Sequence, residues 1–303
     1  MNKYKNLIEK NDLKVNKVTI KNNLTFIETP LGKFVIKDNP GNNIYDYLLS
    51  RGFEYFPRII DMDDEGILFE YIDEVDYDRE EKAQDFIKVL ALLHAKTSYF
   101  KRITPNDNKE IYEKIKNKLL DLNNYYNNLI SIIENQEYMS PSEYFLARNI
   151  SIVFSSINYS NSKIDEWYEL VKDSDKKRVS TLYNDINIDT LIKSKNHTYL
   201  TSFDNVIVDS PINDLLSFFN RYIYEFDFIS LIKVYEKIFP LLNDENILFN
   251  SIITIPDKII VNNNVNNFKN IKKNIDRLYL CLNYLNFKEK ETKGTKENKD
   301  NEK

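Results

Sequence analysis

Two aspartates, each placed directly after a predicted strand, are the residues of this chain best suited to chemistry. An apolar strand ends in a polar turn that carries Asp185, and a strand at residues 199–203 is followed by Asp204. A short strand at residues 191–192 and a hairpin turn at 193–197 lie between them, so both carboxylates are expected at the ends of neighbouring strands. That arrangement suits phosphoryl transfer, in which one carboxylate accepts a hydroxyl proton and the other holds a magnesium ion that neutralises the phosphates.

The segment 179–216 resembles the catalytic half of the aminoglycoside phosphotransferase and choline-kinase-like family, and is most similar to its branch of spore-coat proteins. The acid, strand–turn–strand and second acid are followed by Pro-x-x-Asp-Leu, with Pro211 and Asp214. The resemblance implies that Asp185 is the catalytic aspartate of a His-Gly-Asp-x-x-x-x-Asn loop and that Asp204 binds magnesium. It also implies an α+β, bilobal protein-kinase-like fold with a small antiparallel-sheet N-lobe and a mostly helical C-lobe.

The same segment departs from the family's motif in two places. The His-Gly pair is replaced by Tyr183 and Asn184, and the position of the second metal ligand, five residues after Asp185, is Thr190. A hydroxyl oxygen is a weaker metal ligand than an amide oxygen held by a rigid loop, so Thr190 is expected to be a weakened magnesium ligand. Asp189 is an alternative ligand that the sequence neither supports nor excludes.

The N-terminal part contains a strand like the one that carries the phosphate-binding lysine of kinase-like folds. Period-two hydrophobicity and turn signals at residues 21–23 and 29–32 predict a three-stranded antiparallel meander over residues 14–37. Alternation on the third strand places Val35 and Lys37 on the same face. Lys37 is therefore either a point charge for the phosphates of ATP or a strand-end lysine that points into water.

Two further features of a nucleotide-binding lobe are incomplete. The loop at residues 20–25, where the resemblance places a glycine-rich phosphate loop, contains no glycine. The helix predicted at residues 41–50 lacks the glutamate that pairs with the lysine in active kinase-like proteins, and Asp46 is its only acid. Asp46 is therefore either the partner of Lys37 in a nucleotide-binding site or a solvated aspartate.

The rest of the chain alternates between one more pair of strands and a series of helices. Strands at residues 53–60 and 66–72 complete the small sheet, and a hinge near residues 73–77 is where the resemblance places the adenine. Hydrophobic residues at three- and four-residue steps then predict amphipathic helices. These lie at residues 78–97, 108–134, 140–171, 218–242, 245–255 and 268–287, with an asparagine-rich loop at 262–267.

These elements predict a division into two lobes and a tail. The N-lobe covers residues 1–75, and the helical C-lobe covers residues 76–287 and carries the 179–216 hairpin. Residues 288–303 alternate charges with almost no apolar side chain, which predicts a disordered tail.

Composition restricts the classes of partner and compartment. The 303 residues carry a net charge of −5, which disfavours a general affinity for nucleic acid or an anionic membrane. No apolar stretch reaches the roughly 18 residues of a membrane span, and no signal peptide is recognised. With Cys281 as the only cysteine, a cytoplasmic location is expected, and an association with spores follows from the resemblance alone.

Three functional hypotheses remain open. The first is a degenerate phosphotransferase, a pseudokinase or structural protein that retains binding of ATP and Mg²⁺ and acts through a protein partner. The alternative is an active ATP-dependent phosphotransferase that uses Lys37, Asp185 and Asp204 on a hydroxyl of a small-molecule acceptor. The third is an α+β protein unrelated to kinases, whose acids are placed by chance.

Overall fold

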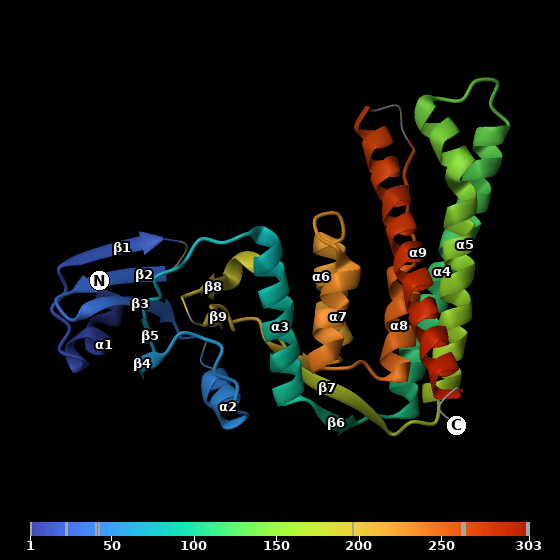
Figure 1. Cartoon of the computed structure of the whole chain (residues 1–303). Coiled ribbons are helices and arrows are strands. Elements are labelled where there is room, and N and C mark those ends of the chain that lie inside the picture. The colour runs from blue at the N-terminus through green and yellow to red at the C-terminus, as the bar shows by residue number, and fades with distance from the viewer. Residues whose placement is uncertain are drawn as a thin grey trace. The chain divides into compact units, whose positions relative to one another are not determined.

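The computed structural model describes residues 2–21, 24–39, 41, 43–195, 197–261 and 265–300. The chain divides into two compact units (Figure 1). Unit 1 consists of Met1–Ser98, Ser180–Asp209 and Lys237–Phe239. Unit 2 consists of Tyr99–Val179, Ser210–Glu236 and Pro240–Lys303.

A five-stranded antiparallel sheet with the order β1-β2-β3-β5-β4 forms the N-terminal part of unit 1. Its strands are β1 (Lys17–Lys21), β2 (Leu24–Thr29), β3 (Gly32–Asp38), β4 (Ile59–Met62) and β5 (Gly66–Glu70). The first three strands are the predicted meander. Because Val35 is paired with Phe26 on one side and Phe69 on the other, these three side chains lie in a row on one face of the sheet.

The opposite face of this sheet is buried under helix α1 (Lys5–Lys10), which follows the short 3-10 helix η1 (Asn2–Tyr4). Ile27, Ile36 and Leu68 pack there against Leu7. Since successive side chains of a strand point to opposite faces, the burial of Ile36 under α1 leaves Lys37 on the face of Phe26 and Phe69.

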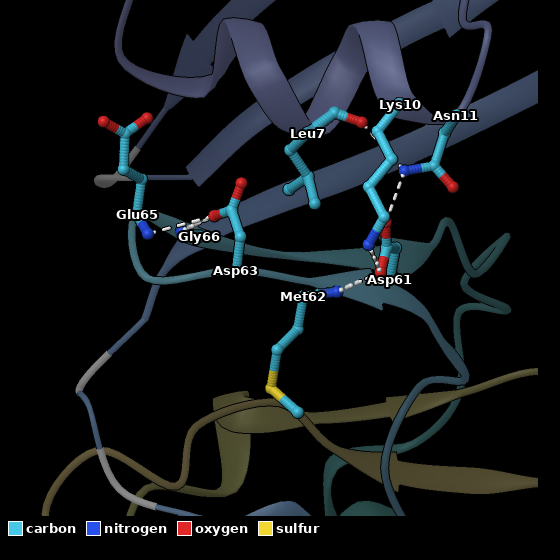
Figure 2. A network of polar contacts seen from close by, with 8 residues as sticks. All are labelled: Leu7, Lys10, Asn11, Asp61, Met62, Asp63, Glu65 and Gly66. Carbon is cyan, nitrogen blue, oxygen red and sulfur yellow. Dashed lines mark hydrogen bonds and ion pairs between the residues drawn. The ribbon is translucent and has the colours of Figure 1, made fainter.

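A polar network fixes α1 to strand β4 (Figure 2). The Asp61 carboxylate pairs with Lys10 Nζ at 2.8 Å and accepts a hydrogen bond from Asn11 Nδ2 at 2.9 Å. Asn11 Nδ2 also donates to the Leu7 carbonyl at 2.8 Å, at the end of α1. The hydrogen bonds from Lys10 and Asn11 hold the pKa of Asp61 below its usual value.

The remainder of unit 1 surrounds a short β-hairpin. Helices α2 (Ile44–Ser50) and α3 (Arg79–Thr97) precede it, and strand β7 (Lys176–Leu182) and the 3-10 helix η2 (Ile188–Thr190) lead into β8 (Leu191–Lys193) and β9 (Thr198–Leu200). The predicted hairpin is confirmed, with Leu191 opposite Leu200. Lys193 of β8 pairs with Asp85 of α3 at 2.9 Å and with Glu81 at 2.5 Å.

Unit 2 is mainly helical. The long helices α4 (Pro105–Glu134) and α5 (Pro141–Val171) pack with α8 (Asn243–Ile253) and α9 (Val265–Asp300) around a shared apolar core (Figure 1). The predicted start of α5 is confirmed by a capping box between Ser140 and Glu143, followed by Pro141 at the first helical position. Among the described residues, no helix is both long and apolar enough to cross a membrane.

The structure differs from the predicted elements in a few places. The single helix predicted at residues 218–242 is two helices, α6 (Ile212–Tyr222) and α7 (Phe228–Ile238), because the Asp227 carboxylate caps the second one by accepting from the Ile229 amide at 3.1 Å. Two short strands, β6 (Tyr99–Arg102) and β10 (Ile207–Asp209), pair with opposite ends of β7 and were not predicted.

The C-terminal segment also differs from expectation. Helix α9 begins at Val265, inside the loop predicted at 262–267, whose residues 262–264 lie outside the described residues. The backbone is helical up to Asp300, although a disordered tail is predicted from residue 288; lysine and glutamate are good helix formers even without an apolar face.

The two compact units are divided differently from the two predicted lobes. Helix α3 and the segment Ser180–Asp209 cluster with the N-terminal sheet in unit 1, whereas the sequence assigns both to the C-lobe. The lobe boundary at residues 75 and 76 stays a prediction.

Candidate functional site

Lys37 and Asp204 form an ion pair in unit 1. Lys37 Nζ lies 2.5 Å from Asp204 Oδ2, and the lysine side chain is 14% exposed against 37% for the aspartate. Ser202 joins the pair: its hydroxyl lies 3.5 Å from Lys37 Nζ and donates to Asp204 Oδ2 at 3.3 Å. The lysine from β3 and the acid after β9 are thus brought together across 167 positions of the sequence.

Edge-to-face packing of aromatic rings positions the segment that carries Asp204. The ring of Phe203, the preceding residue, is completely buried. It lies 5.8 Å from the ring of Tyr45 on α2 and 5.5 Å from the ring of Tyr183 at the end of β7. Such contacts add stability beyond the burial of area, so α2 and β7 fix the place where the Asp204 side chain emerges.

Asp185 lies two residues after the buried Tyr183, in the turn that follows β7. Asn184 between them adopts the left-handed backbone conformation, with φ of +59°, and its side chain donates to the Asn205 carbonyl at 3.0 Å. Asparagine tolerates this conformation better than most residues. The Asp185 side chain is half-buried and has no ion pair or side-chain hydrogen bond within the described part of the chain.

The electrostatics of Tyr183 show that both carboxylates act on one place. Its pKa is raised mainly by burial, and the negative charges of Asp185 and Asp204 raise it further. Tyr45 behaves similarly: burial and then the charge of Asp204 raise the pKa of its hydroxyl. Tyr183 therefore stays neutral beside both acids, and Tyr45 stays neutral beside Asp204.

The proposed second metal ligand, Thr190, is already engaged in hydrogen bonds. Its hydroxyl accepts from the Tyr183 hydroxyl at 2.7 Å and donates to the Asn187 carbonyl at 2.6 Å. A hydroxyl has one proton and two lone pairs, so one lone pair is left. The alternative ligand, Asp189, is exposed and pairs with Arg79 at 3.2 Å.

Asp46, which the sequence indicates as a possible partner of Lys37, stands on α2 next to Tyr45. Its side chain is exposed, whereas the preceding residue, Tyr45, points inward with 3% exposure. The structure pairs Lys37 with Asp204 and records no ion pair of Asp46 among the described residues. The role of Asp46 in nucleotide binding stays a prediction.

A small apolar cavity of about 110 Å³ adjoins Lys37 within unit 1. One wall is the sheet face of Phe26, Val35 and Lys37, and the opposite wall contains Ile192 and Leu200 of the β8–β9 hairpin. The remaining lining residues are Leu24, Tyr45, Pro57, Phe69, Glu70, Tyr71, Ile72 and Thr201. A cavity of roughly 150 Å³ accepts a benzene ring, so this smaller one can take the edge of a flat aromatic ring system.

The residues present suit a magnesium ion that takes few of its ligands from the protein. Within the described chain, no group of three or more histidine, cysteine, aspartate or glutamate side chains could form a metal cage. Magnesium instead commonly takes one or two carboxylates and completes its shell with water and substrate phosphates. Asp204, which is partly exposed and binds Lys37 through one oxygen, suits that role.

Several residues of this site were not found from the sequence. Ser202 and Tyr45 carry no motif and become relevant only through their contacts with Lys37 and Asp204. The sheet side of the cavity was partly predictable from the sequence, because alternation already placed Val35 on the face of Lys37. The hairpin wall had a weaker signal, since Ile192 and Leu200 are ordinary apolar residues of short strands. The tip of the expected phosphate loop, Asn22 and Asn23, lies outside the described residues.

Comparison with known proteins gives a fold but no family. No protein-family model matches this sequence, and no curated protein is significantly similar to it. Among solved structures, an aminoglycoside phosphotransferase from Alicyclobacillus acidocaldarius subsp. acidocaldarius DSM 446 superposes with a TM-score of 0.55 at 11% identity, over 91% of this chain and 90% of that one.

Two further structures are similar to a lesser degree. A choline kinase from Streptococcus pneumoniae has a TM-score of 0.45 at 18% identity, covering 91% of this chain and 99% of that one. A spectinomycin phosphotransferase in complex with AMP has a TM-score of 0.47 at 12% identity, covering 92% and 98%. The predicted fold class is therefore confirmed: the chain has an α+β, protein-kinase-like fold, with a small antiparallel sheet in its N-terminal region and a helical C-terminal part.

Proposed function

We propose that unit 1 binds ATP together with magnesium in a phosphotransferase site that has lost part of its machinery. The observation that carries this proposal is the ion pair of Lys37 and Asp204, 2.5 Å apart, beside the apolar cavity that Lys37 lines. A magnesium nucleotide needs a cation for its phosphates, a carboxylate for its metal ion and a slot for its ring. Lys37, Asp204 and the cavity supply these three features. The kinase-like fold supports the same reading.

Each element of the nucleotide has a matching group in this proposal. One edge of the base enters the cavity between Val35 and Leu200, which is too small for a whole nucleotide and leaves the ribose and phosphates outside it. Lys37 turns its ammonium group from Asp204 toward the phosphates and acts as a point charge. Asp204 then provides a carboxylate oxygen for magnesium, which neutralises charge on the phosphates when bound.

The degenerate part of the proposal rests on the position of the second metal ligand. The Thr190 hydroxyl is engaged by Tyr183 and Asn187, and Asp189 by Arg79, so neither group is directed at a second metal. The loss of a single electrostatic contact in a reaction site typically reduces the rate by about 10²- to 10³-fold. The chain would then hold a nucleotide with one magnesium ion and turn it over slowly or not at all.

A second candidate is an active phosphotransferase that acts on a hydroxyl of a small molecule. One observation favours it: the half-buried Asp185 carboxylate has no partner among the described residues, directly after the strained turn at Asn184. A carboxylate that is held in place and forms no ion pair or hydrogen bond there can accept the proton of an acceptor hydroxyl. A spore-coat relationship, a cytoplasmic location and a protein partner remain predictions from the sequence.

Thermal unfolding with ATP and magnesium, with ATP and a chelator, and with magnesium alone tests nucleotide binding. A ligand at a hundred times its dissociation constant stabilises the folded state by about 2.7 kcal/mol, which raises the unfolding temperature by about 4 °C for a chain of this size, at about 2.1 cal/mol/K of unfolding entropy per residue. We expect this shift with ATP and magnesium together. The absence of any shift at millimolar ATP contradicts the proposal.

Matched variants connect the shift with the ion pair. Asp204→Asn and Lys37→Met should each abolish it. Asp64→Asn and Lys5→Met, which change exposed side chains elsewhere in unit 1, should leave it unchanged. Asp185→Asn separates the two candidates: it should keep the shift in both, and should remove ATP turnover with an acceptor only if the chain is an active enzyme.

A further inference from the structure

A second cavity lies entirely within unit 2 and has a volume of about 720 Å³. Its walls come from α6, from the end of α8 with the extended segment that follows, and from the first turns of α9. The volume falls in the range of pockets that enclose small-molecule ligands, roughly 300–1,000 Å³. Apolar side chains also line it, among them Leu216, Ile252 and Ile271.

The charge of this cavity is opposite to that of the chain. Four cationic residues line it, Lys118, Lys258, Lys273 and Arg277, against a single carboxylate, that of Asp257. The whole chain carries a net charge of −5. A concave surface of one sign concentrates ligands of the opposite sign, so an anion is the expected occupant.

Amide side chains supply the second chemical feature of the cavity. Asn267, Asn270 and Asn274 follow one another at three- and four-residue steps on α9, which places them on one face of the helix. Asn220 of α6 lines the cavity as well. A carboxamide both donates and accepts hydrogen bonds, which matches the hydroxyl groups of a polyol or sugar.

The walls of the cavity are held by hydrogen bonds from outside it. Tyr125 of α4 donates to the Ile259 carbonyl at 2.6 Å, and the neighbouring Tyr126 donates to the Asp257 carbonyl and accepts from the Ile259 amide at 3.1 Å. These bonds fix the segment that carries Lys258. The Lys258 ammonium lies 4.5 Å from the centre of the Tyr125 ring, an arrangement that stabilises its position.

The opposite wall is fixed in the same way. The Tyr224 hydroxyl donates to the Lys273 carbonyl at 2.7 Å, and the Lys273 ammonium lies 5.0 Å from the centre of the Tyr224 ring. The Arg277 guanidinium donates to the carbonyls of Ile253 and Ile255, both at 3.2 Å. A site whose walls are already ordered loses less conformational entropy when a ligand binds.

We propose that this cavity binds a small anionic molecule rich in hydroxyl groups, of the class of sugar phosphates and sugar acids. The lining lysines bind the phosphate or carboxylate group, the asparagines of α9 bind the hydroxyl groups, and the apolar lining residues contact the carbon face of the ring. The assignment rests on residues of unit 2 alone and does not depend on phosphoryl transfer in unit 1.

Isothermal titration calorimetry of the full chain, without nucleotide and at low salt, tests this assignment. The probes are glucose 6-phosphate, glucuronate, glucose and inorganic phosphate. We expect one or both of the anionic sugars to bind more tightly than glucose and than inorganic phosphate. Which of the two binds more tightly identifies a phosphate or a carboxylate as the source of the charge, and either result supports the proposal.

Two neighbouring lysines of α9 provide the matched variants. Lys273→Gln removes a lining cation and should weaken binding of the anionic sugar about tenfold or more, since a hydrogen bond to a charged group contributes about 1.5–3 kcal/mol. Lys272→Gln changes an exposed lysine outside the cavity and should leave the affinity unchanged. Asn274→Ala should weaken binding of the sugar and not of inorganic phosphate.

Several outcomes would overturn the assignment. In the first, neither anionic sugar binds at millimolar concentration. In the second, glucose or inorganic phosphate binds as tightly as the anionic sugars. In the third, Lys272→Gln weakens binding as much as Lys273→Gln does. Asp204→Asn should bind the probe as the unaltered chain does. A failure of nucleotide binding in unit 1 is therefore distinguished from a failure of this site.

Discussion

The Tyr183 hydroxyl donates a hydrogen bond to the Thr190 hydroxyl at 2.7 Å. These are two of the positions at which the segment 179–216 departs from the motif that it resembles, with tyrosine in place of histidine and threonine in place of asparagine. Tyr183 is completely buried, and its ring packs against Phe86 and Phe203. The two departures therefore form one structural unit, in which the Thr190 hydroxyl, at the position of the motif's second metal ligand, helps to hold the turn together.

The first prediction concerns this pair. Tyr183→Phe and Thr190→Val should each destabilise the chain by about 1 kcal/mol, because each removes the hydrogen bond between the two hydroxyls. The double variant should cost clearly less than the sum, by about 0.5 kcal/mol or more, as expected for residues in direct contact. Urea unfolding of the four proteins measures the coupling. Strictly additive losses would contradict the idea that the two substitutions compensate for each other.

The second prediction concerns the small cavity beside Lys37. Val35→Phe places a larger ring in the space between the sheet and the β8–β9 hairpin, and should abolish the thermal shift with ATP and magnesium. Overpacking typically costs about 1–3 kcal/mol, so the folded state should survive. Val18→Phe enlarges a half-buried valine of β1 that does not line the cavity. Loss of nucleotide binding in both variants, or in neither, would argue against the cavity as the base site.

The sequence predicts well those parts of the fold that depend on local patterns. Alternation of apolar residues places Val35 and Lys37 on one face of β3, and the structure confirms this through the burial of Ile36 under α1. The cap at Ser140 and the turn before Asp185 are equally local, because each depends on residues within one helical or hairpin turn.

Interactions between distant segments are where sequence reasoning reaches its limit. The sequence indicated Asp46 as a possible partner of Lys37, whereas the structure pairs Lys37 with Asp204, whose segment is held by the packing of Phe203 against Tyr45. The spacing of apolar residues also fails to predict the end of a helix where a single side chain interrupts the run, as the capping Asp227 does between α6 and α7. Strands as short as β10 contain too few residues for alternation to be seen.

The third prediction concerns pH and the attachment of α1 (Figure 2). Hydrogen bonds from Lys10 and Asn11 hold the pKa of Asp61 below its usual value of 3.8. The charged carboxylate is thus favoured in the folded state, so its stabilisation is complete above the unfolded pKa and is lost as the pH falls through the lower folded pKa. Asp61→Asn should cost up to about 1 kcal/mol near neutral pH, and the difference should shrink below about pH 4.

Chemical denaturation of both proteins at neutral and acidic pH measures this effect. Asp64→Asn, in the turn between β4 and β5, replaces an exposed carboxylate and serves as the control. The control should show little change at either pH. A loss from Asp61→Asn that is the same at both pH values would mean that the side chain's shape, and not its charge, fixes α1.

The fourth prediction concerns an ion pair inside unit 2 that no sequence pattern indicated. Arg178 Nε donates to Glu245 Oε1 at 2.9 Å, Arg178 Nη2 donates to Glu245 Oε2, and the side chains are only 11% and 6% exposed. The Leu242 amide and the Pro240 carbonyl complete the network. Glu245→Gln keeps the shape of the side chain and removes the carboxylate charge opposite Arg178; breaking a buried ion pair in this way typically costs about 3–5 kcal/mol.

An exposed pair of the same unit provides the contrast. Glu169 and Lys172 are 2.6 Å apart on the surface, with side chains 68% and 41% exposed, and Glu169→Gln should cost less than about 1 kcal/mol. Replacing both buried partners, as in Arg178→Met with Glu245→Leu, should recover much of the loss, because no unpaired charge remains. Guanidinium is unsuitable for this test since it screens ion pairs, so urea unfolding is the measurement. If Glu245→Gln costs no more than Glu169→Gln, the buried pair contributes no more than a surface contact.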